Sequence, residues 1–305
     1  MSEPPATRRW RPPFTVDLPT VLAPLRRGKG DPCLRQDESG RFWLAANTPT
    51  GAGTLMLRAG ADGAVEARAW GGGAEPLLEG VPALLGADDD DSGFVAHHDA
   101  VAWARRRLPT LRLGATGRVW DVLIPAVLEQ KVTGYEARRS WRELCRRFGE
   151  PAPGPAPAGM RVPPTPAAIR SIVDWNWHKA GVDHSRRSAL IAAARVAHRL
   201  ERAATLRGAE GRSLLRHVPG IGVWTAAEIA QRAWGDPDAV SFGDFHIPAI
   251  VGHALVGRAL DDEGMHAVLA PYAPQRQRAV RYLEAAGYSR PRFGPRMPVR
   301  DYRAI

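Results

Sequence analysis

Residues 216–236, RHVPGIGVWTAAEIAQRAWGD, place one proline and two glycines between two stretches with helical periodicity. Pro219 fixes its own φ angle and ends the first helix, while Gly220 and Gly222 permit the positive φ angles of a tight turn. Such a turn leaves the first amide groups of the next helix without intrahelical partners, at the positive end of its dipole. Amides in this arrangement bind a phosphate without a charged side chain. The stretch indicates either a phosphate-binding hairpin or an ordinary helix–turn–helix connection with a glycine cap.

An aspartate follows the hairpin closely enough in the sequence for both to belong to one functional site. Asp244, in DAVSFGDFHIPAI, lies 22 residues after Gly222 at the expected start of another helix, where Pro248 is tolerated in the first turn. Its structural role is that of an N-cap. Because backbone amides hold such a carboxylate ionised and fixed, it can also stabilise an oxocarbenium-like transition state and orient water at a sugar carbon.

The charge of the chain is unevenly distributed. Residues 1–103 hold 10 Lys and Arg against 14 Asp and Glu, whereas residues 104–305 hold 32 against 18. A surplus of this size in one part predicts a polyanionic partner, most often nucleic acid. A compositional bias towards arginine is the alternative, since lysine occurs only at positions 29, 131 and 179, but such a bias does not explain the local shortage of acids.

The remaining composition indicates an ordinary globular protein of the cytoplasm. No run of 18 apolar residues and no apolar segment near the N-terminus is present, so we expect neither a membrane span nor a secretory signal. Cys33 and Cys145 form no paired motif, which excludes a four-ligand zinc or iron–sulfur site.

The pattern along the chain predicts a mainly α fold with a small N-terminal α+β domain. Residues 40–70 contain three short apolar or alternating runs separated by turn residues, of which GADG marks a hairpin. The acidic run 88–91 is expected to be a solvated loop, and PAPGPAPAGMRVPPTP, residues 151–166, a connector. Domain boundaries are expected at 1–107 (α+β), 108–288 (helical, with the hairpin at 214–234) and 289–305 (basic tail). Helices are expected at about 98–107, 118–129, 133–148, 166–173, 185–203, 211–217, 224–234, 245–258, 263–270 and 274–286.

The hairpin and the spaced aspartate together resemble the helix–hairpin–helix DNA glycosylase superfamily. The segments that carry the resemblance are LRHVPGIGVWTA, residues 215–226, and VSFGDFHI, residues 240–247. Within the superfamily, the chain is most similar to the bacterial 3-methyladenine DNA glycosylase II (AlkA-like) group, over residues 108–287. The N-terminal strands are compatible with the small domain of that group.

The resemblance implies a catalytic residue and a base pocket. Asp244 matches the catalytic aspartate. Trp224 stands where relatives that also cleave the DNA backbone carry a Schiff-base lysine, so a monofunctional enzyme without AP lyase activity is expected. Trp224, Phe245 and Tyr272 would line a pocket whose rings attract a cationic methylated purine. Glu228 departs from the aromatic residue of the alkylation-repair relative, and it would attract cations, bind a base edge or face solvent.

The resemblance also implies how the protein holds double-stranded DNA. Gly220, Ile221 and Gly222 would grip a phosphate, with a monovalent cation (Na⁺ or K⁺) bound through hairpin carbonyls and no other cofactor. Gln130 and Lys131 match the loop that fills the gap left by a flipped nucleotide, with a phosphate or orphaned-base contact as the alternative for Lys131. The further expected phosphate contacts are His246, Arg276, Arg278, Arg186, Arg187 and Arg216.

The function expected from these observations is excision of alkylated purines of the 3-methyladenine type in base excision repair. A glycosylase for a deaminated or oxidised base is one alternative, and a catalytically idle lesion-binding protein is another. We expect a monomer in the cytoplasm, associated with the nucleoid, and no contact with a membrane.

Overall fold

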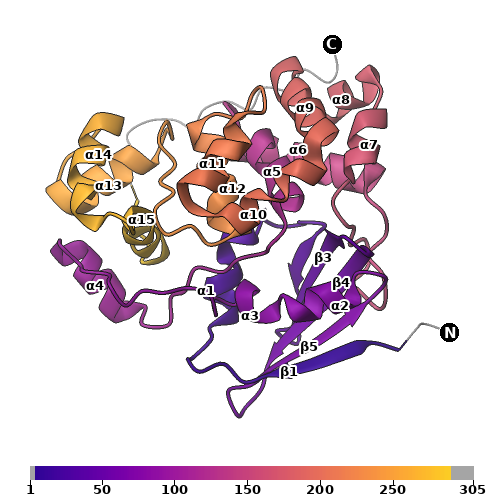
Figure 1. Cartoon of the computed structure of the whole chain (residues 1–305), viewed down its shortest axis with the longest axis horizontal. Coiled ribbons are helices and arrows are strands. Elements are labelled where there is room, and N and C mark those ends of the chain that lie inside the picture. Colours follow the sequence, from indigo (N-terminus) through magenta and orange to yellow (C-terminus); the bar gives the residue numbers. More distant parts are fainter. Residues whose placement is uncertain (1–3, 290–305) are drawn as a thin grey trace.

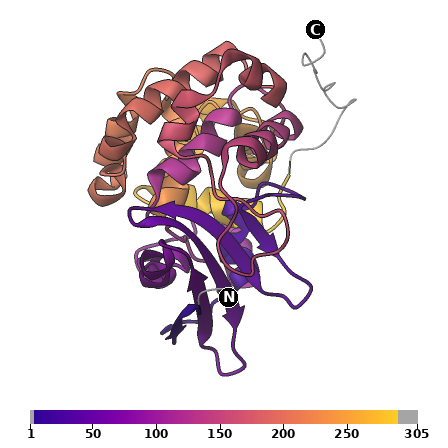
Figure 2. The ribbon, with the colours of Figure 1, turned by 90° about the vertical axis from the view of Figure 1, so that its right-hand side faces the viewer.

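The computed structural model describes residues 4–289. The predicted basic tail therefore lies outside the described residues, apart from Ser289. In these residues, a small antiparallel sheet near the N-terminus lies beneath a larger group of helices (Figures 1 and 2). This arrangement confirms the mainly α fold class with a strand-rich N-terminal part.

The sheet has the strand order β1-β5-β4-β3-β2. Its central strands β3, β4 and β5 are the three runs predicted from residues 40–70, and the predicted hairpin joins β4 to β5. Their alternating side chains supply two apolar faces, because successive residues of a strand point to opposite sides. The strands are β1 (Ala6–Trp10), β2 (Leu34–Gln36), β3 (Phe42–Thr48), β4 (Gly51–Ala59) and β5 (Val65–Trp70).

Short helices and a loop cover the two faces of the sheet. One face packs Leu55 and Leu57 against α1 (Leu18–Leu22), α2 (Ala74–Glu79) and α3 (Val81–Leu84). The other face carries Trp43 and Trp70, whose stacked ring centroids lie 5.6 Å apart. Met160 and Val162 from the proline-rich connector complete this second cluster. The connector is thus irregular, as predicted, but it also closes the open face of the sheet.

The helices from α4 onward divide between two further apolar cores. The first core joins α5 (Val119–Leu128), α6 (Gly134–Phe148), α7 (Pro166–Ser171), α8 (Asp174–Ala180), α9 (His184–Leu200), α10 (Ala203–Leu206), α11 (Gly208–Arg216) and α12 (Val223–Ala233). The second core joins α4 (Asp99–Arg107), α13 (Ile247–Val256), α14 (Asp262–Leu269), the 3₁₀ helix η2 (Ala270–Tyr272) and α15 (Arg276–Ala285). The 3₁₀ segment η1 (Ala23–Leu25) extends α1.

Helix α4 belongs to the C-terminal core rather than to the sheet. It packs on α13 and α15, and Val101 and Ala104 are fully buried there. Figure 1 shows α4 beside the yellow C-terminal helices, far from the strands that precede it. The change of core therefore falls before residue 94, ahead of the boundary expected at 107.

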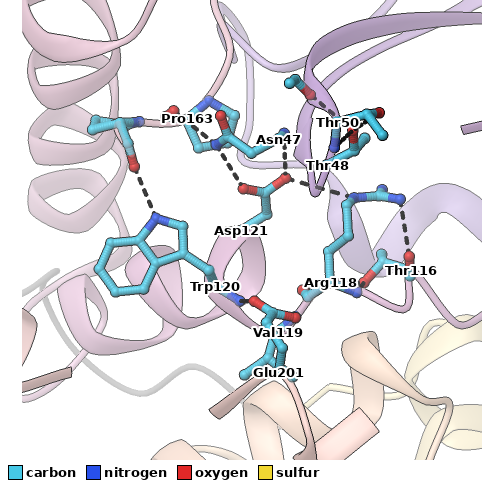
Figure 3. Close-up of polar contacts among 12 residues, drawn as sticks. Asn47, Thr48, Thr50, Thr116, Arg118, Val119, Trp120, Asp121, Pro163 and Glu201 are labelled. Carbon is cyan, nitrogen blue, oxygen red and sulfur yellow. Dashed lines mark hydrogen bonds and ion pairs between the residues drawn. The ribbon is translucent and has the colours of Figure 1, made fainter. Parts of the chain in front are cut away.

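A polar network joins the sheet to the helical part (Figure 3). The carboxylate of Asp121 on α5 accepts hydrogen bonds from the backbone amide and the side-chain amide of Asn47 on β3, at 3.0 and 2.9 Å. The Arg118 guanidinium lies 3.5 Å from the same carboxylate. Glu201 caps the start of α5 by accepting hydrogen bonds from the amides of Val119 and Trp120, both at 2.8 Å. Burial raises the pKa of Asp121 and of Glu201.

Candidate active site

The hairpin between α11 and α12 is a tight turn anchored by one buried side chain. Gly220 has a φ angle of +87°, and a Cβ atom there would lie 2.6 Å from Cβ of Ala189 on α9. Ile221 is buried and its amide donates to Val218 O at 3.0 Å. Gly222 has extended backbone, and a Cβ atom there would meet nothing within 4 Å. Only Gly220 needs to be glycine for the turn itself, and Gly222 leaves the start of α12 accessible.

The loop after α5 is fastened to this hairpin. Gln130 Nε2 donates to Gly220 O at 2.9 Å and to Thr225 Oγ1 at 2.8 Å. The next residue, Lys131, is exposed and has a φ angle of 53°, which is uncommon for a residue other than glycine. The structure therefore brings the two predicted loop residues next to the hairpin, with Lys131 at an exposed and strained position.

Asp244 lies between the starts of α12 and α13, with both oxygens engaged. Oδ1 accepts hydrogen bonds from the amides of His246 and Ile247, at 2.6 and 2.9 Å. Oδ2 accepts one from Trp224 Nε1 at 3.0 Å. The carboxylate is half-buried, so it is held at two helix starts and is still reachable from solvent. These contacts join the two residues that the sequence singled out for chemistry.

Polar contacts also support the loop that carries Asp244. The amide of Gly243 donates to Asp262 Oδ2 at 2.9 Å, from the first turn of α14. Phe245 is 75% exposed, and its ring lies edge-on to His246, which is itself exposed. Phe245 therefore projects from the surface beside the carboxylate. Sequence reasoning missed Asp262, because its link to Gly243 spans 19 residues and no local pattern signals it.

Glu228 lies beneath this loop in a buried ion pair. One carboxylate oxygen accepts a hydrogen bond from Ser241 Oγ at 2.6 Å, and the other lies 2.8 Å from Arg232 Nη1. Glu228 does not face solvent, which corrects one of the three alternatives drawn from the sequence. Its carboxylate instead ties the segment before Asp244 to α12. Arg232 and Ser241 are the partners that the sequence did not reveal.

Tyr272, which was predicted to line the base pocket, packs in the C-terminal core instead. It is 3% exposed, stacks against Phe94 and His98, and its hydroxyl lies 2.8 Å from His98 Nδ1. Burial raises the pKa of Tyr272 to about 12. The prediction failed because α4 and the segment before it cover this ring, a long-range contact that the local sequence does not show.

Several arginines predicted to contact phosphates are engaged within the protein. Arg278 is fully buried, and its Nη2 lies 2.5 Å from Asp89 Oδ1. This pair corrects two expectations, because the side chain of Asp89 is only 4% exposed although it belongs to a run expected to be solvated. Arg276 pairs with Asp238 at 2.5 Å.

The other predicted arginines differ in exposure. Arg186 is buried and donates to Leu128 O at 3.0 Å, and Arg187 pairs with Asp174 at 2.5 Å. Arg216, at the end of α11, is exposed next to the hairpin. Of these pairs, only that of Arg278 with Asp89 joins an arginine of residues 104–305 to an acid of residues 1–103 and so offsets part of the surplus of the helical part.

No protein-family model and no curated protein matches the sequence. Solved structures share its fold. A 3-methyladenine DNA-glycosylase from Archaeoglobus fulgidus matches with 15% identity and a TM-score of 0.75, over 90% of this chain and 96% of that chain. MBOgg1, solved with a low-affinity DNA ligand, matches with 14% identity and a TM-score of 0.72, over 92% and 95% of the two chains. An 8-oxoguanine glycosylase/lyase from Clostridium acetobutylicum, solved with double-stranded DNA, matches with 11% identity and a TM-score of 0.68, over 88% and 91%.

These similarities establish the fold that the sequence resemblance implied, which is that of the helix–hairpin–helix DNA glycosylases. At such low identity they do not assign an activity to the chain. Within residues 4–289, no helix is long and apolar enough to cross a membrane.

Proposed function

We propose that this protein is a monofunctional DNA glycosylase that excises alkylated purines from double-stranded DNA. The observation that carries the proposal is the Asp244 carboxylate, held by two helix-start amides and the Trp224 indole beside an accessible hairpin. Solved DNA glycosylases of several specificities share the fold. A fixed anion of this kind suits a reaction that develops positive charge on a sugar.

The proposal gives a role to each part of this surface. The exposed hairpin amides bind a DNA phosphate, and the loop with Gln130 and Lys131 lies beside them to occupy the space of a flipped nucleotide. The carboxylate of Asp244 then faces the anomeric carbon. As the glycosidic bond breaks, its negative charge stabilises the oxocarbenium-like sugar, and water attacks that carbon.

Two observations support the finer assignment to hydrolysis and to alkylated purines. Position 224 is tryptophan, and no lysine follows Lys179 in the chain, so the segment around Asp244 offers no amine for a Schiff base. The half-buried Trp224 ring is oriented by its hydrogen bond to Asp244. An electron-rich ring in this place attracts a purine that methylation has made cationic.

The test is base release from methylated duplex DNA by the native protein and by Asp244→Asn. The substitution keeps the shape of the side chain and removes the charge, so we expect release of 3-methyladenine and 7-methylguanine to fall by about a hundredfold or more. Asp99→Asn, an exposed position on α4, is the matched control and should behave as the native protein. Equal release by native protein and Asp244→Asn would exclude the role of Asp244. Tight binding to an abasic-site analogue without release of any base would instead support a lesion-binding protein.

A further inference from the structure

A short basic loop of the N-terminal part runs against the acidic balance of that part. Residues 26–30, RRGKG, hold three of the ten Lys and Arg of residues 1–103 and no acid. This segment, the basic loop, lies between η1 and β2. Arg26 and Lys29 are exposed, whereas Arg27 is buried. Two of its three cations are therefore accessible to a partner.

Asp31 closes the basic loop and fastens it to α6. One carboxylate oxygen accepts a hydrogen bond from the amide of Arg27 at 2.8 Å. The other accepts one from the amide of Cys33 at 3.0 Å and one from Trp141 Nε1, on α6, at 3.1 Å. Asp31 is only 2% exposed, so its oxygens are engaged inside the protein. These contacts fix the position of the basic loop relative to α6.

Two arginines in the first half of α6 lie directly against the basic loop. A Cβ atom at Gly28 would lie 2.9 Å from Cδ of Arg138, and one at Gly30 would lie 3.6 Å from Cδ of Arg142. The two arginine stems therefore lie over the backbone on either side of Lys29. Arg138 is exposed and Arg142 is half-buried, so helix and loop bring their cations to one surface.

The basic loop is also linked to the hairpin, through the residues that follow α5. Arg27 Nη1 lies 3.7 Å from Oε1 of Glu129. The next residue, Gln130, donates to Gly220 O of the hairpin at 2.9 Å. Two adjacent side chains thus contact the basic loop on one side and the hairpin on the other, and the segment that carries them lies between the two.

Five cationic side chains around the basic loop have no anionic partner. Within residues 4–289 none of them has a hydrogen bond or an ion pair. The nearby acid Glu129 pairs with the buried Arg27 instead. Unpaired like charges that the fold holds together are the electrostatic footprint of a polyanion. These five residues, the basic cluster, are Arg26, Lys29, Lys131, Arg138 and Arg142.

We propose that the basic cluster is a second phosphate-binding surface, with which the N-terminal part holds the DNA backbone beside the hairpin. The inference rests on the proposed glycosylase function and adds the N-terminal part to its DNA interface. The hairpin binds a phosphate through backbone amides, whereas the basic cluster binds phosphates through side-chain charges. Contacts of this kind position the duplex without reading its sequence. Two anchors on either side of the loop with Lys131 hold the duplex while a nucleotide leaves the stack.

The experiment measures binding of a duplex with an abasic-site analogue by fluorescence anisotropy over a range of salt concentrations. Each phosphate contact adds about 0.9 to the steepness with which the logarithm of affinity falls against the logarithm of salt concentration. For Arg26→Ala combined with Lys29→Ala, we expect this slope to become shallower by about 2 and the affinity at low salt to fall about tenfold or more. Arg26→Lys combined with Lys29→Arg keeps both charges and should keep the native slope.

Arg195→Ala combined with Arg199→Ala is the matched control. Both arginines are exposed near the end of α9, with no hydrogen bond or ion pair of their side chains in the described part of the chain. The end of α9 lies at the start of α5, where Glu201 accepts a hydrogen bond from the amide of Val119, whereas the basic cluster lies at the other end of α5. This variant therefore loses the same net charge at a different place, and its slope should stay within about 0.5 of the native slope.

Three results would each overturn the inference. Equal changes of slope in the two double-alanine variants would show a general effect of net charge. An unchanged slope without Arg26 and Lys29 would show that DNA does not reach the basic loop. A lower temperature of thermal unfolding for that variant, with the slope of the folded protein unchanged, would show that the two charges serve the fold.

The native protein separates this inference from the function on which it rests. A native protein that binds no duplex and releases no base contradicts the proposed function and the inference together. A native protein that binds the duplex, with a slope that does not depend on Arg26 and Lys29, contradicts the inference alone.

Discussion

Asp244 and Glu228 show how the surroundings of a carboxyl group decide its role. Asp244 is half-buried and bound only by neutral donors, so its negative charge is not cancelled by a cation in contact with it. Glu228 is buried against a cation and serves the structure. The residue type alone distinguishes none of these roles.

The first residue-scale prediction concerns the buried pair of Glu228 and Arg232. Glu228→Gln keeps the shape of the side chain and its hydrogen bond from Ser241 but leaves the guanidinium without its closest anion. Removing one partner of a buried ion pair costs about 3 kcal/mol, and the side chains of this pair are only 10% and 12% exposed. We therefore expect urea denaturation to give a free energy of unfolding lower by about that amount. A change within about 0.5 kcal/mol, the range of an ordinary surface substitution, would show that Arg232 is satisfied by other groups.

At the scale of the element, the two glycines of the hairpin differ in their expected roles: the turn requires Gly220, whereas Gly222 leaves room for a bound phosphate. Gly220→Ala forces a methyl group into a positive-φ position 2.6 Å from Cβ of Ala189, and we expect it to cost about 2 kcal/mol of stability. Gly222→Ala meets nothing within 4 Å and keeps ordinary backbone angles, but alanine is a poorer N-cap of α12 than glycine, so stability should fall by less than about 1 kcal/mol. The methyl group at position 222 nevertheless obstructs the approach of a phosphate to the start of α12.

Thermal unfolding and fluorescence anisotropy with a duplex containing an abasic-site analogue measure the two effects separately. We expect Gly222→Ala to unfold only slightly below the temperature of the native protein but to bind the duplex about tenfold more weakly, because one amide–phosphate contact to a charged group is worth about 1.5 kcal/mol. Unchanged affinity of Gly222→Ala would show that DNA does not approach the hairpin at this residue.

Elements with strong local signals were predicted well. The hairpin has its signal in adjacent residues, and the periodicity of residues 133–148 predicted α6, which spans Gly134–Phe148. The short helices α8 and α10 were not predicted, because they have too few turns to display periodicity. The burial of Tyr272 and of the Asp89–Arg278 pair was not predicted either, because it depends on contacts between residues more than 170 positions apart in the sequence. Such contacts are properties of the fold, and no pattern within one segment carries them.

At the scale of the molecule, polar contacts fasten the N-terminal part to the helical part. Segment 20–24 reaches from the sheet side to Arg232 and Arg281, and Asn47 on β3 fixes Asp121 on α5. The N-terminal part thus contacts Arg232, whose partner Glu228 is bonded to Ser241 in the segment before Asp244. The stability of this interface should therefore depend on the ionisation of its buried carboxyl groups.

Asp121→Asn tests this dependence through pH. Burial raises the pKa of Asp121 in the folded protein, so the folded state binds a proton more readily than the unfolded state, whose carboxyl groups titrate near 3.9. As the pH falls from 7 towards 4, the native protein should therefore gain stability relative to Asp121→Asn, and the gain should level off below pH 4.

Asp62→Asn supplies a comparison of opposite sign, because the hydrogen bond from Arg9 lowers the pKa of Asp62, so its contribution to stability is lost at acidic pH. Urea denaturation of the three proteins at pH 7, 6, 5, 4, 3 and 2 measures both slopes, because the contribution of Asp62 is lost only as the pH falls below about 3.9. If the difference in free energy of unfolding between the native protein and Asp121→Asn does not vary with pH, burial of the charged Asp121 carboxylate does not destabilise this interface.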